Sequence, residues 1–306
     1  MSKAQNATFL HHRNFMDYHS DRFSDASVMV FKANKLIAVL PANYNEDVVY
    51  SHQGLSYGGL IIQSGSKLEA VIGIVKSVLE YYHSKQFKAL QIKVIPSIYN
   101  SQPSEFLAYL QYVLQAKLIR SEILSVIDHS NEDIKYAALR KRGLKKAQSQ
   151  DLIVKEVENL EPFYNQILKP NLQQSHQVNP VHSLEELQLL KQRFPNHIKQ
   201  FNVYKDRDLV AGTTVFETKH VAHAQYIGSN QLRQELGSLD LLFHLLITGI
   251  YKEKSYFDFG NSNELSGLKV NKGLLYFKES FGARTITQQT LEFKTESHQK
   301  LASIFI

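Results

Sequence analysis

The chain has 306 residues, which is enough for two domains of ordinary size, and 43% of them are hydrophobic, so real cores can form. It contains no cysteine, which excludes disulfides, a thiol nucleophile and a cysteine-based zinc site. With 35 basic and 29 acidic residues the formal net charge is +6, which suits an anionic ligand and is equally typical of an ordinary basic surface.

The first residues, MSKAQNATFLHHRNF, show no basic segment followed by an apolar one, so no secretion signal is expected. The most apolar stretch, residues 241–251, is shorter than the roughly 20 residues that span a bilayer. We therefore expect a soluble, cytoplasmic protein without a transmembrane segment.

Residues 9–25 are rich in histidine and aspartate, and two interpretations of them are disfavoured. His12 and Asp17 fit the H-x4-D pattern of glycerolipid acyltransferases, but the membrane-facing segment and the glycine-rich block of those enzymes are missing. The other interpretation is a metal site, but the spacing of the candidate ligands gives them no shared helical face; they are His11, His12, Asp17, His19, Asp21 and Asp25. We expect no metal site, and polar helices that dock on the first half instead.

An internal repeat organises the chain. Residues 30–38 read VFKANKLIA and residues 203–211 read VYKDRDLVA, and each predicts a β-hairpin. Both copies continue in the same order of strand, helix and strand: 48–62, 67–83 and 89–95 in the first half, and 221–228, 238–253 and 256–259 in the second. We therefore predict an α/β (α+β) protein of two similar units, each a mixed, twisted sheet flanked by helices.

The junction between the units is expected near residues 130–155, after the basic sequence RKRGLKK at 140–146. The first unit should then cover residues 1–145, ending with a helix at 105–119, and the second should cover residues 146–306. A helix-rich segment at 160–194 precedes the second hairpin.

Two segments of the second unit resemble the GNAT superfamily in the right order. QELGSL at 234–239 resembles the [QR]-x-x-G-x-[GA] turn, in which amide groups before a helix hold the pyrophosphate of coenzyme A. NKGLLYFKESFG at 271–282 resembles the N-x-x-A-x-x-x-Y-x-x-x-G segment, with Lys278 where many members place a catalytic tyrosine. The resemblance implies that the cofactor is held by Gln234, Gly237, Ser238 and Asn271.

The FK-x-x-[FY]-G setting of Lys278 resembles the FemAB-like branch, as do AGTTVFETKHVAHAQYIGS, SHQGLSYGGL and FDFGNSNELSGLKV, and the resemblance covers roughly residues 9–285. It implies transfer of an acyl group to an amine, with acetyl-CoA, another acyl-CoA or aminoacyl-tRNA as donor. The implied acceptor is an anionic nucleotide-sugar or lipid-linked glycan precursor of the cell envelope. Residues 55–60 lack the carboxylate of bridge-forming members, so an acceptor other than a peptidoglycan pentapeptide is expected.

Candidate catalytic residues follow from what acyl transfer to an amine requires, namely a base, a stabilised oxyanion and a protonated leaving group. Lys278 can supply a cation or a proton; the alternative is a solvated surface charge. His223 is a candidate base, or else a core histidine. Asp258 can orient the acceptor, or else stabilise a turn.

Substrate-binding candidates lie at strand ends, in one loop and in the basic helix. Gln225, Tyr226 and Asn261 belong to the strands of the second unit, and His52, Tyr57, Gly58 and Gly59 form a loop of the first. Arg140 and Arg142 can bind acceptor phosphates, although a solvated basic helix is equally consistent with the pattern. A catalytically inactive binding module also remains open.

Overall fold

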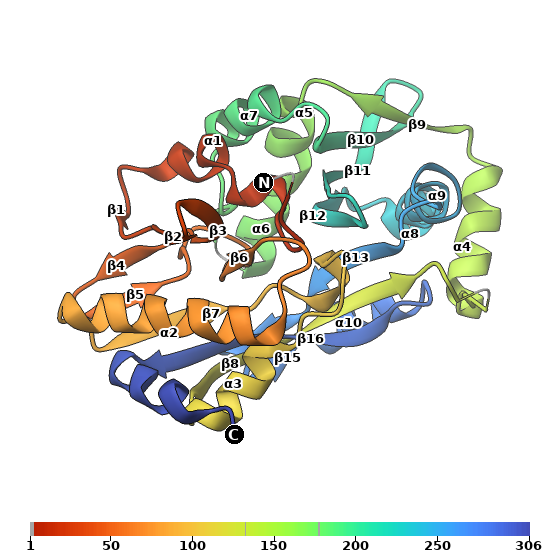
Figure 1. Cartoon of the computed structure of the whole chain (residues 1–306). Coiled ribbons are helices and arrows are strands. Elements are labelled where there is room, and N and C mark those ends of the chain that lie inside the picture. Colours follow the sequence, from red (N-terminus) through yellow and green to blue (C-terminus); the bar gives the residue numbers. More distant parts are fainter. Residues whose placement is uncertain (1–2, 132, 177) are drawn as a thin grey trace. The chain divides into compact units, whose positions relative to one another are not determined.

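The computed structural model describes residues 3–131, 133–176 and 178–306 (Figure 1). The chain forms two units: unit 1 comprises Met1–Glu122 and Thr287–Ile306, and unit 2 comprises Ile123–Ile286. These boundaries differ from the junction expected at residues 145 and 146. The reason is strand pairing between distant segments, since residues 124–128 pair within unit 2 and residues 290–294 pair within unit 1.

Unit 1 contains short helices and one long helix around two sheets. Its helices are η1 (Phe9–His11), α1 (Arg13–Met16), η2 (Asp17–His19), α2 (Leu68–Ser84), η3 (Ser97–Tyr99), α3 (Phe106–Leu114) and η7 (Thr295–Ser303). Its strands are β1 (Ser24–Asp25), β2 (Val28–Lys32), β3 (Lys35–Leu40), β4 (Asn43–Asn45), β5 (Val48–Tyr50), β6 (Ile61–Ile62) and β7 (Ala89–Lys93), with the first part of β8 (Lys117–Asp128) and the last part of β16 (Arg284–Lys294).

The core of unit 1 lies between its sheets and helix α2. One sheet has the order β1-β4-β5-β7-β16, with β5 parallel to β7, and the other has the order β2-β3-β6. The apolar residues that predicted a helix at 67–83 are buried: Val71, Ile74, Val75, Val78 and Leu79. The 3.6-residue period therefore placed one face of α2 on the sheet, as expected.

Unit 2 contains the longer strands. Its helices are α4 (Ala138–Gln148), α5 (Glu161–Phe163), η4 (Tyr164–Leu168), α6 (Lys169–His176), α7 (Leu184–Arg193), α8 (Arg233–Leu236), α9 (Ser238–Leu245), η5 (Leu246–Ile250), η6 (Leu265–Gly267) and α10 (Lys272–Glu279). Its strands are β9 (Leu152–Val157), β10 (Ile198–Lys205), β11 (Asp208–Glu217), β12 (Val221–Ser229), β13 (Tyr256–Asn261), β14 (Asn263–Glu264) and β15 (Lys269–Val270), with the remaining parts of β8 and β16.

The main sheet of unit 2 has the order β8-β13-β12-β11-β10-β9. Only β12 and β13 pair in parallel in the described part of this sheet, and the segment between them holds α8, α9 and η5. The core consists of the inner faces of these strands and the apolar face of α9 and η5, including Leu242, Phe243 and Leu246.

The internal repeat is visible in the backbone. In both hairpins a β-bulge interrupts the register at the same place in the repeat, between Val30 and Phe31 in β2 and between Val203 and Tyr204 in β10. In both units a helix connects two parallel strands, β5 with β7 and β12 with β13. The predicted fold class of two similar α/β units is therefore confirmed.

One predicted helix is shorter than expected. The helix expected at 105–119 ends early, because Gln115 adopts a positive φ of 53° and strand β8 begins at Lys117. Across the described residues, no helix is both long enough and apolar enough to cross a membrane.

Candidate functional site

Lys278 is buried, and its ammonium group binds backbone carbonyls. Helix α10 begins after Asn271, whose side chain accepts a hydrogen bond from the amide of Leu274 at 2.9 Å. Lys278 is the most deeply buried residue of this helix, with 2% of its surface accessible. Its Nζ donates to the carbonyl oxygen of Gly260 at 3.0 Å and to that of Asn261. Lys278 is therefore not a solvated surface charge.

A bulge in β13 presents those two carbonyls. The register of β13 against β8 shifts between Asp258 and Asn261, and Gly260 within the bulge has a φ of 72°. A positive φ suits glycine because glycine lacks the Cβ that would clash with the backbone. Burial lowers the pKa of Lys278 from 10.5 to about 8, and the nearby Asp258 carboxylate opposes this effect. The amine stays mostly protonated at neutral pH.

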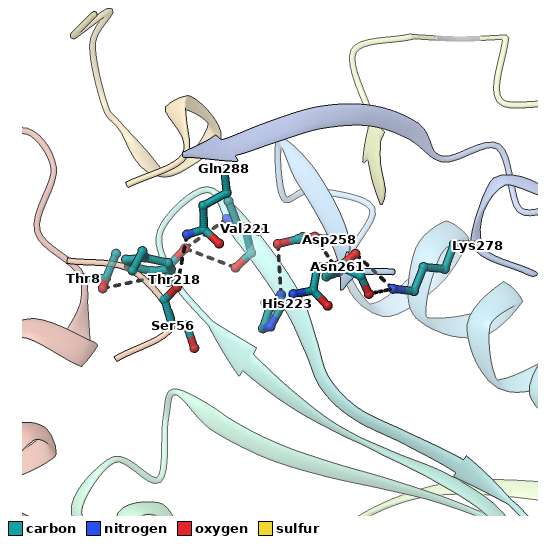
Figure 2. Close-up of polar contacts among 11 residues, drawn as sticks. Thr8, Ser56, Thr218, Val221, His223, Asp258, Asn261, Lys278 and Gln288 are labelled. Atoms are coloured by element: carbon teal, nitrogen blue, oxygen red, sulfur yellow. Dashed lines mark hydrogen bonds and ion pairs between the residues drawn. The ribbon is translucent and has the colours of Figure 1, made fainter. Parts of the chain in front are cut away.

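His223 and Asp258 form a hydrogen-bonded pair on adjacent parallel strands. The register of β12 and β13 places the two residues opposite each other, and His223 Nδ1 lies 2.9 Å from Asp258 Oδ2. Asp258 is 1% exposed and His223 is 19% exposed at their side chains. Asp258 Oδ1 accepts a second bond from the amide of Gly260 at 2.7 Å. Figure 2 shows the pair, with Lys278 reaching toward Asn261 from the neighbouring helix.

This pairing fixes which nitrogen of His223 can act as a base. An ionised carboxylate only accepts hydrogen bonds, so Nδ1 of the neutral imidazole must carry the proton. Nε2 then keeps its lone pair and can accept a proton from a substrate. The arrangement matches the base and orienting carboxylate of catalytic triads in its geometry.

The pair lies where the two parallel strands separate. In the described part of the chain, β12 and β13 pair from Val221 and Tyr256 as far as His223 and Asp258. Beyond that point β12 stays paired with β11, and β13 meets β8 again at Asn261. Polar groups at the carboxyl ends of parallel strands commonly contact ligands, because the backbone there no longer pairs.

The other predicted site residues on β12, β13 and α10 have different surroundings. Gln225 follows on β12, and its buried Oε1 has no hydrogen-bond partner among the described residues. The Tyr226 hydroxyl lies 2.6 Å from His182 Nδ1. Asn261 is exposed at its side chain, and Asn271 caps the opposite end of α10 from Lys278, where its Nδ2 donates to Glu264.

The predicted pyrophosphate turn is covered by helix α4. Gly237 has a φ of 68°, and Ser238 is 0% exposed. Gln234 is exposed, and its carbonyl accepts a hydrogen bond from Lys146. Within α4, Arg142 is exposed, whereas Arg140 forms a 2.7 Å ion pair with Asp240 of α9. Arg140 therefore serves first to attach α4.

The predicted acceptor loop is packed inside unit 1. His52 has a φ of 67° and stacks on His19 with ring centroids 5.1 Å apart. The Tyr57 hydroxyl donates to Thr8 Oγ1 at 3.2 Å. The Gly58 amide donates to the carbonyl of Lys93, and Gly59 has a φ of 107°. Gln288 of β16 donates to the carbonyl of Ser56 in the same loop (Figure 2).

The sequence interpretation missed two contributors to the site. Gly260 supplies both the bulge and a carbonyl for Lys278, and a glycine inside a strand pattern is the signal that could have indicated it. Asp240 holds helix α4, and nothing in its local sequence points to that pairing. No group of three histidine, aspartate or glutamate side chains among the described residues is arranged to hold a metal ion.

In each unit a helix connects two parallel strands, in agreement with the two similar units that the sequence predicts. No protein-family model matches the sequence, and no curated protein sequence is detectably similar to it. Among solved structures, the chain is similar to FemX, with a TM-score of 0.67 and 11% identity over 95% of this chain and 93% of that one. It is also similar to L-PGS from Bacillus licheniformis, with a TM-score of 0.58 and 12% identity over 88% and 84% of the two chains. The fold is therefore that of the FemAB-like tandem GNAT proteins.

Proposed function

We propose that the protein transfers an acyl or aminoacyl group from an activated donor to the amine of a cell-envelope or surface-polysaccharide precursor in the cytoplasm. The observation that carries the proposal is the arrangement of His223, Asp258 and Lys278, an oriented base and a buried cation next to the point where β12 and β13 separate. The FemAB-like fold supports a transferase, because FemX is among the solved structures to which the chain is similar.

In the proposed reaction the acceptor amine attacks the carbonyl carbon of the donor, and a C–N bond forms. His223 Nε2 takes the proton that the amine loses, and Asp258 stabilises the imidazolium. Two N–H groups of Lys278 bind the carbonyls of Gly260 and Asn261, and the third donates to the oxyanion. When the C–O or C–S bond to the leaving group breaks, the imidazolium returns the proton to that leaving group.

The donor is an acyl-CoA, such as acetyl-CoA, or an aminoacyl-tRNA, and the acceptor is an anionic nucleotide-sugar or lipid-linked glycan precursor. Asn261 is exposed beside the pair, and Gln225 lies two positions after His223 on the same face of β12, which supports a substrate contact for both. Tyr226 is buried, and its hydroxyl is bonded to His182. Arg142 is exposed on α4 and available to a phosphate. Aminoacyl transfer of the peptidoglycan-bridge type is the closest variant of this function.

The test is incubation with a panel of acyl-CoA and aminoacyl-tRNA donors and amino-sugar nucleotides, followed by mass spectrometry of the acceptor. We expect one donor class to add its acyl mass, and His223→Gln to lower the rate at least about 100-fold. His220→Gln, three positions away and outside the pair, is the matched control. Equal product formation by the His223 variant and the native protein would contradict the proposal.

A binding role without chemistry is the second candidate, and the burial of Lys278 is the observation that favours it. In that case the ammonium only ties α10 to the bulge of β13. The two functions separate in one comparison: substrate turnover that falls in Lys278→Met while ligand affinity is kept supports catalysis, and binding without turnover of any donor supports the binding role.

A further inference from the structure

The β-hairpin of β2 and β3 in unit 1 presents an apolar face to solvent (Figure 1). Met29 of β2 lies opposite Val39 of β3, and nearer the turn Phe31 lies opposite Leu36. Side chains alternate along a strand and paired residues point to the same side, so these four share one face, while Val30 packs into the core. Met29 is 65% exposed, Phe31 55% and Leu36 45%. We call these four residues the hairpin face.

The equivalent face of unit 2 is buried. The two hairpins have the same register, so Met29 corresponds to Asn202 and Val39 corresponds to Gly212. Asn202 is 0% exposed, and a Cβ at Gly212 would lie 2.6 Å from the ring of Phe163, so α5 covers this face. Strand β10 also pairs with β9, whereas β2 lies at the edge of its sheet among the described strands. Unit 1 thus exposes apolar side chains at positions that unit 2 covers, although solvent exposure favours polar residues.

The tip of the same hairpin is basic. Lys32 and Lys35 lie opposite each other there, and both are exposed. Residues 26–45 contain no aspartate or glutamate. Between the lysines, Ala33 and Asn34 have φ values of 47° and 61°, as a tight two-residue hairpin turn requires. Apolar side chains beside lysines suit an anionic bilayer surface, because the apolar groups enter the boundary of the acyl chains and the ammonium groups reach the lipid phosphates.

The size and the charge of the hairpin face do not suit a second copy of the chain. Full burial of one such side chain removes roughly 100 Å² from water, so the four offer no more than about 400 Å², half of the about 800 Å² that each partner buries in a stable interface. Two copies stacked through this face would also bring the lysines of both tips together, and like charges repel. Pairing of two copies along the edge of β2 would leave the hairpin face exposed.

We propose that the hairpin face, together with Lys32 and Lys35, binds the surface of an anionic lipid bilayer. Met29 and Phe31 enter the boundary between headgroups and acyl chains, and the two lysines contact lipid phosphates. This peripheral binding needs no helix across the bilayer. It is also independent of the transferase function proposed above, since the hairpin lies in unit 1 and the candidate catalytic residues lie in unit 2.

The first experiment measures co-sedimentation of the full chain with vesicles of phosphatidylcholine, alone or with about one-third phosphatidylglycerol. We expect binding to the anionic vesicles that weakens with added salt, and little binding to the neutral ones. Replacing both Lys32 and Lys35 by glutamine should lower the partition coefficient at least about tenfold, since each lysine near an anionic surface contributes about a factor of five. The matched control is the double variant Lys141→Gln and Lys145→Gln, which removes the same charge from the exposed side of α4. Equal losses in the two double variants, or no binding to anionic vesicles, would overturn the proposal.

The second experiment uses the fact that the sequence contains no tryptophan. Phe31→Trp places a single fluorophore on the hairpin face, and Tyr112→Trp places one on α3, at a position that is 84% exposed. With anionic vesicles, the emission of the Phe31 variant should shift to shorter wavelength and become protected from acrylamide, whereas that of the Tyr112 variant should not change. Unchanged emission and quenching in the Phe31 variant would show that the hairpin face does not enter the bilayer.

Sedimentation equilibrium without lipid tests the alternative occupant. We expect the same mass for the native protein and for Phe31→Gln at every concentration. A native dimer that Phe31→Gln converts to a monomer would show that a second copy covers the hairpin face, and the proposal would fail.

Discussion

Replacing Lys278 by methionine should preserve or raise the stability of unit 2 while abolishing activity. Burial lowers the pKa of Lys278 from 10.5 to about 8, and at about 1.4 kcal/mol per pH unit the charged amine costs the fold about 3 kcal/mol at pH 7. The variant leaves the carbonyls of Gly260 and Asn261 without a donor, which offsets about 1–3 kcal/mol. The net expectation is a gain of about 0–2 kcal/mol, where deletion of a buried contact usually brings a loss.

The lowered pKa of Lys278 also makes the free energy of unfolding depend on pH. The pKa of Lys278 is lower in the folded protein than in the unfolded chain, so the unfolded chain holds the extra proton between about pH 8 and pH 10.5. The free energy of unfolding therefore rises across that window in the native protein, by up to about 3 kcal/mol. Lys278→Met lacks the titrating group and should lack this rise.

Urea denaturation followed by circular dichroism, at pH 7 and at pH 10, measures both effects. Lys272→Met, at an exposed position of the same helix, is the control and should change stability by less than about 0.5 kcal/mol. A loss of more than about 2 kcal/mol in Lys278→Met at pH 7 would refute the reasoning. The buried ammonium would then stabilise the fold, whereas its burial is expected to cost free energy. A rise with pH that is equal in the native protein and the variant would refute it as well.

Three further predictions concern the His223 pair and the buried histidines. Asp258→Asn should leave the fold intact and lower kcat by about 10²–10⁴-fold, because an amide no longer fixes the proton on Nδ1 of His223; initial rates and imidazole nitrogen NMR test this. Gly260→Ala adds a Cβ 3.1 Å from the His223 ring at a φ of 72°, so kcat should fall about tenfold or more, with about 1–2 kcal/mol lost in denaturation. Gly273→Ala on α10, where the new Cβ would lie at an ordinary contact distance of 3.6 Å from Asn271 Oδ1, should not impair activity. Burial lowers the pKa values of His11 and His52 in unit 1 from 6.5 to about 4, so the neutral forms stabilise the fold above pH 6.5 and that stability declines as the pH falls toward 4; denaturation curves should show this decline, and it should be smaller in His52→Asn.

The sequence could predict what depends on local patterns. The nine-residue repeat located both hairpins, and the spacing of apolar residues located α2 and the helix that begins at Ser238, because burial of one face requires a fixed period. The sequence indicates His223 and Asp258 as separate candidates on successive strands. Their hydrogen bond could not be predicted, since it depends on the parallel register of β12 and β13.

Contacts between distant segments account for what the sequence did not predict. The boundary expected at residue 145 differs from that of the structure, in which residues 124–128 pair with β13 and residues 290–294 pair with β7. Such pairing between distant strands leaves no mark in the local sequence pattern. The sequence of the helix at 138–148 is typical of a basic surface helix, yet Arg140 forms an ion pair with Asp240, one hundred positions further along, and its side chain is only 14% exposed. A charged residue gives no sequence signal of such a partner.

The interleaved order of the two units sets the order in which they can fold during synthesis. Unit 2 is one continuous segment, from Ile123 to Ile286, and all of its strands emerge from the ribosome before Thr287. Unit 1 begins first but lacks the part of β16 that pairs with β7, and the helix η7 that packs on α2, until residues 287–306 have been made. In the nascent amino-terminal segment β7 is therefore unpaired on one side while the later segment reaches its native state. This order reverses the usual N-to-C order of domain folding.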